Sequence, residues 1–134
     1  MMFRIAAILL AAVFLTACQT THQFAQPGPG WRTWHGQLKY TNPKRSIIGE
    51  VIASARNGTD FQLEYMAGPG FPLIMIQQDA AASKAKGALA FGTPGHLKGW
   101  YSLRESFVHL PADAHEISIE SPKTKERFYF RFAP

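Results

Sequence analysis

From Trp31 onward the chain alternates apolar and polar residues with a period of two, and this pattern constrains its fold more than any other feature. In residues 34–40, Trp34, Leu38 and Tyr40 fall on one parity and polar side chains fall on the other. Successive side chains of a strand point to opposite faces, so the pattern predicts strands with one buried face and one wet face. Aromatic residues make up 13% of the chain, which also favours strands.

The dipeptide Asn57-Gly58 separates two such stretches and is a strong short-range signal of a β-hairpin. A two-residue turn there places Ile52 opposite Leu63, on the face that also holds Phe61 and Tyr65. Gly58 is then expected at positive φ, where a side chain would be strained.

Further elements follow the hairpin. Residues 73–76 are apolar on both faces and predict a strand that is buried on both sides or lies in the middle of the sheet. Ser102 and Glu105 form a capping box, so we expect a short amphipathic helix that ends before Pro111. The remaining strands are expected at residues 86–91, 116–120 and 127–132. The predicted fold class is mainly β: a curved antiparallel sheet of about seven strands with one short helix.

The amino terminus carries eleven consecutive apolar residues, 5–15, after Arg4. This run is too short to cross about 30 Å of hydrocarbon and is typical of a secretory signal. It ends in Leu15, Thr16, Ala17 and Cys18, the only cysteine of the chain. These four residues resemble the lipobox of bacterial lipoproteins. The resemblance implies cleavage after Ala17 and attachment of diacylglycerol and an amide-linked acyl chain to Cys18, which anchors the protein in a membrane. The alternative is an ordinary secretory signal with an unrelated cysteine.

The sequence divides into three parts: a signal peptide at 1–17, the lipidated Cys18 with a flexible tether at 18–30, and a single β-rich domain at 31–134. The tether is polar and rich in proline and glycine. Gln19 follows the cysteine where an Asp would indicate retention in the inner membrane, by resemblance to enteric sorting rules. We therefore expect the periplasmic face of the outer membrane, rather than the inner membrane or the cell surface.

The sequence offers no convincing catalytic or metal-binding motif. Ser83 and Lys86 match the first element of serine acyl-enzymes, but the further elements are missing. The five histidines never fall at i,i+2 or i,i+4 spacing, and one cysteine cannot form a disulfide or a cysteine-based zinc site. The formal net charge of +5 is spread thinly rather than clustered as in a nucleic-acid-binding surface. We expect no enzyme, no metal, no cofactor and no nucleic-acid partner.

Four segments carry a wider resemblance: Trp34-x-Gly36-x-Leu38, Phe61-x-Leu63-x-Tyr65, the loop 68–72 leading into residues 73–76, and the terminal hairpin with Ile117, Ile119, Phe128 and Phe130. In this order they resemble the Lol-type lipoprotein carriers and receptors, the LolA/LolB family. The resemblance implies an incomplete half-barrel, wrapped around a helical lid, that holds acyl chains. The chain is shorter than that family and lacks one of its helical segments.

The receptor branch of that family is itself a lipoprotein, and the loop after its third strand carries an exposed leucine. Here the corresponding position is Gly70, with Phe71 beside it, so Phe71 is the candidate membrane or transfer tip.

Two functions remain open at this point. The first is a lipid-anchored envelope protein that binds an acyl chain or a lipoprotein inside the half-barrel, with an apolar lining of Trp34, Leu38, Ile52, Phe61, Leu63, Tyr65, Phe128 and Phe130. The alternative is a lipid-anchored structural or protein-interaction module whose core is filled by its own side chains. A small barrel is usually filled, and a cavity lined by Trp34, Leu63, Phe128 and Phe130 would favour the first.

Overall fold

The computed structural model describes residues 21–134. In chain order the elements are β1 (Arg32–Thr41), β2 (Ser46–Arg56), β3 (Asp60–Met66), β4 (Pro72–Gln78), β5 (Ser83–Lys86), the 3₁₀ helix η1 (Ala88–Ala90), α2 (Lys98–Phe107), β6 (Glu116–Ser121) and β7 (Glu126–Phe132).

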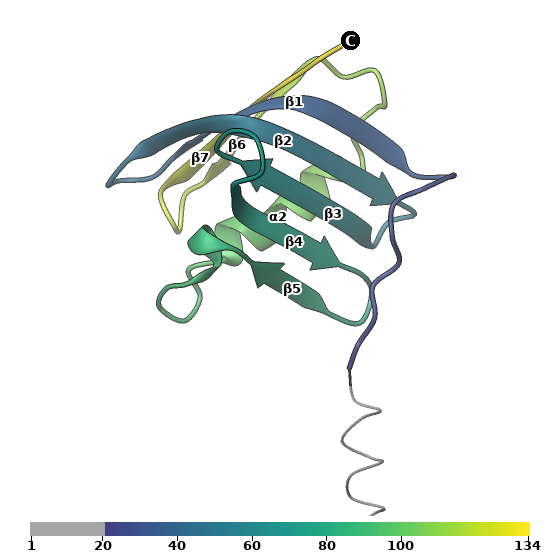
Figure 1. Cartoon of the computed structure of the whole chain (residues 1–134), viewed down its shortest axis with the longest axis horizontal. Coiled ribbons are helices and arrows are strands. Elements are labelled where there is room, and N and C mark those ends of the chain that lie inside the picture. The colour runs from purple at the N-terminus through teal and green to yellow at the C-terminus, as the bar shows by residue number, and fades with distance from the viewer. Residues whose placement is uncertain (1–20) are drawn as a thin grey trace, which may run out of the picture.

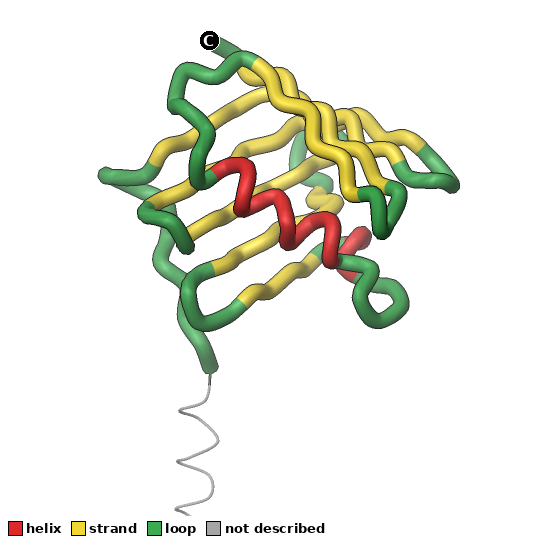
Figure 2. The backbone as a smooth tube through the Cα atoms, turned by 180° about the vertical axis from the view of Figure 1, so that it is seen from behind, coloured by secondary structure: helices red, strands yellow, loops and turns green. Residues whose placement is uncertain are grey.

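The strands form one antiparallel sheet in the order β5-β4-β3-β2-β1-β7-β6, so β5 and β6 are its two edges. The sheet curves strongly without closing, and α2 lies across its concave face (Figure 1 and Figure 2). This arrangement confirms the predicted fold class, a mainly β, curved and incomplete antiparallel sheet of seven strands with one short α-helix in the described part of the chain.

The period-two pattern accounts for which side chains face α2. On β1, Trp34, Leu38 and Tyr40 are buried, and the residues between them are exposed or half-buried. On β7, Phe128 and Phe130 are buried, together with every second residue of the strand, and the residues between them are exposed. The concave face therefore forms the core with α2, while the convex face meets solvent.

The β2–β3 turn differs from the prediction by one residue. Arg56 pairs with Asp60, which leaves residues 57–59 in the turn, and the positive φ of 57° falls on Asn57 rather than Gly58. Because side chains alternate along a strand, a shift of the β2–β3 register by one residue moves every side chain of β2 to the other face of the sheet. Ile52 consequently pairs with Glu64 and lies on the convex face, so its predicted place beside Leu63 is wrong.

Charge and burial explain why this register forms. Arg56 donates to Asp60 Oδ2 from both Nε and Nη2, at 3.0 and 2.7 Å, which closes the end of the hairpin. The register also places Phe61, Leu63 and Tyr65 opposite Ala55, Ala53 and Val51, all of which are buried. The predicted register would have turned Glu50 toward the core, and burying an unpaired carboxylate is costly.

Two smaller predictions are also wrong. The helix begins at Lys98, so Ser102 lies inside it and donates to the carbonyl of Gly99 at 2.7 Å instead of capping the helix. The strand predicted at residues 86–91 ends at Lys86 and is followed by η1. Gly87 causes the break, because its φ is 110° and a Cβ there would lie 2.7 Å from the carbonyl oxygen of Leu73.

Candidate functional site

The side chains predicted to line an acyl-chain cavity lie in the interior of the half-barrel, with the exception of Ile52. Each of these seven has an exposed fraction of 2% or less: Trp34, Leu38, Phe61, Leu63, Tyr65, Phe128 and Phe130. They come from three strands, β1, β3 and β7, and the curvature of the sheet brings them together. The sequence thus identified the interior face of the sheet.

Helix α2 fills this interior. The ring of Phe107 lies 5.3 Å from Trp34, 5.3 Å from Phe61 and 5.0 Å from Phe130, measured between centroids. The ring of Trp100 lies 4.9 Å from that of Phe128 in an edge-on arrangement. Aromatic rings at these separations are in direct contact. The predicted lining therefore packs against side chains of the same protein.

Opening the interior to a ligand would expose buried side chains of α2. Trp100, Leu103 and Phe107 are at most 2% exposed, and re-exposing three such side chains costs about 5–9 kcal/mol. An acyl chain drawn from a bilayer is already out of water, so its transfer brings little hydrophobic gain to offset that cost. The interior is better suited to hold the sheet together than to receive a lipid.

Tyr65 has a structural partner on each side. Its hydroxyl lies 2.8 Å from the carbonyl oxygen of Ile47 and 3.0 Å from that of Leu38, and it shares its one hydrogen between these acceptors. Burial raises the pKa of Tyr65 to about 12, so the phenol stays protonated under physiological conditions. Tyr65 thereby connects β3 to β2 and β1.

Ile52 lies in a shallow hollow on the convex face. This hollow has a volume of about 340 Å³ and is lined by Pro27, Gly28, Thr33, Ile52, Ser54, Gln62 and Glu64. Two of these residues belong to the segment that leads into β1, and four others carry polar side chains. Ile52 is therefore excluded from the apolar interior where the sequence placed it.

Phe71 lies at the surface, with an exposed fraction of 59%. Its loop is short and rigid: Ala67 N–H donates to the carbonyl of Phe71 at 3.1 Å, and Gly70 has a φ of 77°. That φ disfavours any residue with a Cβ, so an exposed leucine at this position would strain the backbone. The apolar tip of the loop is therefore carried by Phe71, the next residue.

An apolar groove, which we call the rim groove, lies beside this loop. It has a volume of about 400 Å³ and is lined by Glu64, Tyr65, Met66, Gly70, Pro72, Ile74, Met75, Lys86 and Gly87. Ile74 and Tyr65 are fully buried, whereas Met66 and Met75 are half-buried and open to the surface. Lys86 and Glu64 are the two charged residues of the lining. The sequence points to Tyr65 and the neighbouring Phe71, but not to the groove, because three separate segments form it.

A second, polar cleft lies between the β1–β2 turn, the β6–β7 turn and the loop after η1. Its volume is about 760 Å³, and its lining includes Tyr40, His96 and Glu126. Both ring nitrogens of His96 face carbonyl oxygens, of Thr93 at 3.0 Å and of Leu89 at 3.2 Å, so His96 holds its own loop together.

Glu126 is a buried acid that the sequence analysis missed. It is 5% exposed, and it accepts a hydrogen bond through Oε2 from the hydroxyl of Tyr40, whose pKa is raised to about 12 by burial and by this bond. A Cβ at Gly99 would collide with Glu126 Oε1, so the carboxylate packs on the first turn of α2, where the helix dipole favours a negative charge. Glu126 alternates in step with the buried Phe128 and Phe130. A predicted strand beginning at residue 126 instead of 127 would therefore have placed it in the core.

Leu15, Thr16, Ala17 and Cys18, the predicted lipobox, lie outside the described residues. Within residues 21–134 no helix is long and apolar enough to cross a membrane, and no cluster of three or more His, Cys, Asp or Glu side chains could hold a metal ion.

No protein-family model matches the sequence of this chain, and a search of curated proteins finds no match.

Proposed function

We propose that the chain is a lipid-anchored protein of the periplasmic face of the outer membrane, held there by an acylated Cys18, that binds single acyl chains in the rim groove. The half-barrel serves as a rigid scaffold. The observation that carries the proposal is the apolar groove of about 400 Å³ next to the exposed Phe71, on a sheet whose interior is already filled. That volume lies within the roughly 300–1,000 Å³ range of small-molecule sites.

The groove supports weak and reversible binding. Burying about six to eight methylene groups at about 0.8 kcal/mol each gives about 5–6 kcal/mol, or a dissociation constant of roughly 40–200 µM. This affinity applies to a chain taken from water. A chain already in the bilayer gains little hydrophobic energy by the transfer, so the groove competes for it through the high local concentration of lipid around an anchored protein. Rapid release suits a protein that passes acyl chains on.

The chemistry at the groove also matches a lipid. The half-buried Met66 and Met75 offer flexible thioethers that adapt to an irregular chain. Lys86 is exposed at the same groove and pairs with Met75 across β4 and β5, so its ammonium can meet a carboxylate or phosphate headgroup while the tail lies on the methionines.

The second candidate is the lipid-anchored structural or interaction module without a ligand. The filled interior favours it, since the seven predicted lining residues are buried against α2. The two candidates differ in one measurable property, the binding of an acyl chain by the folded domain.

Two measurements on the Cys18→Ala protein test the proposal. The variant should leave the detergent phase in a phase-partition assay, because it cannot be acylated. In its soluble form, it should bind a fluorescent fatty acid, and Met75→Glu should weaken that binding at least tenfold, because the groove then buries a carboxylate. Gln77→Glu, two residues along the same face of β4, is the matched control.

Retention of Cys18→Ala in membranes after carbonate washing would refute the anchor. Equal fatty-acid binding by the Met75→Glu and Gln77→Glu proteins would refute the groove. Failure of every variant to bind would favour the module without a ligand.

A further inference from the structure

Positive charge is concentrated in one segment of the domain. Residues 80–104 contain four Lys and Arg residues and no Asp or Glu, whereas the remainder of residues 18–134 carries nine of each. The whole net charge of the chain after the predicted cleavage site therefore lies in this segment, at Lys84, Lys86, Lys98 and Arg104. The low average charge of the chain therefore includes a local excess of positive charge in this segment.

The first part of this segment, residues 80–97, comprises the edge strand β5, η1 and the loop that leads into α2, and forms one side of the molecule. Lys84 and Lys86 lie in this part, whereas Lys98 and Arg104 lie in α2 itself. In Figure 1 and Figure 2, β5 is the lowest strand, and the loop between β5 and α2 reaches down to the same level. Lys84 and Lys86 are exposed, and Phe91 at the start of the loop is 84% exposed, the largest fraction among the large hydrophobic side chains described. Exposed lysines beside an exposed aromatic are typical of surfaces that lie in a membrane interface.

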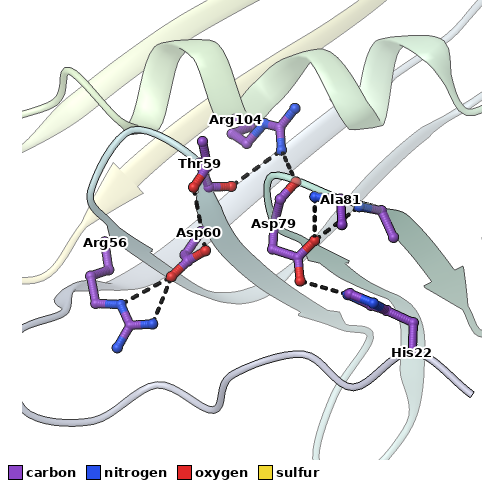
Figure 3. Close-up of polar contacts among 8 residues, drawn as sticks. His22, Arg56, Thr59, Asp60, Asp79, Ala81 and Arg104 are labelled. Carbon is purple, nitrogen blue, oxygen red and sulfur yellow. Dashed lines mark hydrogen bonds and ion pairs between the residues drawn. The ribbon is translucent and has the colours of Figure 1, made fainter.

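The described part of the tether leaves the domain on this same side. It runs past the ends of β3, β4 and β5 and ends below β5 in both views (Figure 1 and Figure 2). His22 Nε2 donates to Asp79 Oδ2 at 2.6 Å, at the turn that joins β4 to β5 (Figure 3). This bond holds the pKa of Asp79 below its ordinary value.

The turn that receives the tether is itself fixed in place. Asp79 Oδ1 accepts from the backbone N–H groups of Ala81 and Ala82 at 2.8 and 2.9 Å. Arg104 of α2 donates to the carbonyls of Asp79 and Thr59, so the turn is joined to the core helix (Figure 3). Docking His22 on this turn therefore orients the whole domain relative to the tether.

The length of chain before His22 limits how far the turn can lie from the anchor. Four Cα–Cα steps separate Cys18 from His22, which span at most about 15 Å. An acylated Cys18 keeps the Cα of His22 within that distance of the headgroups. While the His22–Asp79 bond is formed, the β4–β5 turn lies farther away only by the two hydrogen-bonded side chains. This limit allows the neighbouring lysines of β5 to reach the lipid surface.

The chemistry of β5 favours lipid over a second protein strand. The strand is only four residues long, and two of its four side chains are lysines. Short edges with lysine resist pairing with another chain, whereas each Lys near an anionic bilayer is attracted to it.

We propose that β5 and the β5–α2 loop lie against anionic phospholipid headgroups, with Lys84 and Lys86 on the phosphates and Phe91 in the interface, and that the His22–Asp79 bond sets this orientation. The inference rests on the proposed anchor at Cys18. It places the rim groove, to which Lys86 contributes, beside the membrane from which an acyl chain would come.

The test uses the full lipidated protein in phosphatidylglycerol-containing vesicles that carry a spin-labelled lipid. Acylation occupies Cys18, the only native cysteine, so a single introduced thiol can be labelled with a fluorophore. Ser83→Cys on β5 and Ser118→Cys on β6 make the same change at exposed positions of the two opposite sheet edges. We expect strong quenching of the label at 83 and little at 118.

Added substitutions test the two causes of the orientation. Lys84→Glu should lower the ratio of docked to undocked protein at least about fivefold, because one charge near an anionic surface contributes about that factor. Lys123→Glu, an exposed lysine in the β6–β7 turn, should leave the quenching unchanged. His22→Ala should bring the quenching at 83 and 118 closer together.

Vesicle flotation separates the possible failures. Protein that does not float with the vesicles refutes the anchor and, with it, this inference. Protein that floats but shows equal quenching at 83 and 118, or shows no response to Lys84→Glu, overturns the inference and leaves the anchor standing. Protection of residue 83 in whole envelopes but not in protein-free vesicles would assign the surface to a protein partner and also overturn it.

Discussion

Truncation of Phe107 to alanine tests whether the half-barrel interior is a core or a closed ligand chamber. Phe107 is fully buried in the last turn of α2, with its ring 5.3 Å from Trp34, 5.3 Å from Phe61 and 5.0 Å from Phe130. These neighbours belong to β1, β3 and β7, and the hydrogen-bonded sheet holds them apart, so they cannot close the gap left by the ring. We therefore expect a loss near the top of the range of about 3–5 kcal/mol for Phe→Ala in a core.

That loss is large for this domain. A chain of this size has a total stability of about 5–15 kcal/mol, and the expected change lowers its melting temperature by about 12–20 °C. Thermal and urea unfolding, followed by circular dichroism, measure it. Phe91→Ala is the control, since Phe91 is 84% exposed and the substitution should change stability by less than about 0.5 kcal/mol.

The result also bears on function. A loss below about 1 kcal/mol, together with stronger fatty-acid binding, would show that α2 covers a chamber as a movable lid. The conclusion that the interior is a filled scaffold would then be wrong.

Three further predictions concern the surface, one turn and the buried phenols. Phe71→Ala should leave stability within about 0.5 kcal/mol, as at other exposed sites, while weakening fatty-acid binding at the adjacent groove; a stability loss above about 3 kcal/mol in a melting experiment would contradict the exposed position. Asn57→Val should destabilise the hairpin by about 1–2 kcal/mol, because Asn57 has a φ of 57°. Gly58→Val should cost less, and the reverse order in chemical denaturation would contradict the observed turn. The pKa values of Tyr40 and Tyr65 are raised to about 12 in the folded state, so stability should hold below pH 10 and fall as the pH rises from about 10 to 12, where only the unfolded phenols ionise. Tyr65→Phe should reduce that slope in denaturation curves recorded across this range, and an unchanged slope would contradict the assignment.

The candidate sites differ in how far the sequence predicts them. The inward parity of Trp34, Leu63 and Phe130 follows from local alternation, which needs no knowledge of the partner strands. The rim groove does not follow from it, because Met66, Met75 and Lys86 come from three strands whose register had to be known first. The same holds for the contact of His22 with Asp79, which are separated by 57 residues.

Alternation in the sequence determined the mainly β class, most of the strand positions and the buried face of β1, β3 and β7, because each depends on neighbours within a few residues. The tertiary structure decided three things: the register that moves Ile52 to the convex face, the filling of the interior by α2, and the position of Lys84 and Lys86 on an exposed edge of the sheet. The register depended on which pairing buries no charge, a comparison between whole strands. The filling of the interior depended on the fit of α2 to the curvature of seven strands. The position of the lysines depended on which edge of the sheet β5 occupies. None of the three is therefore a property of any single segment.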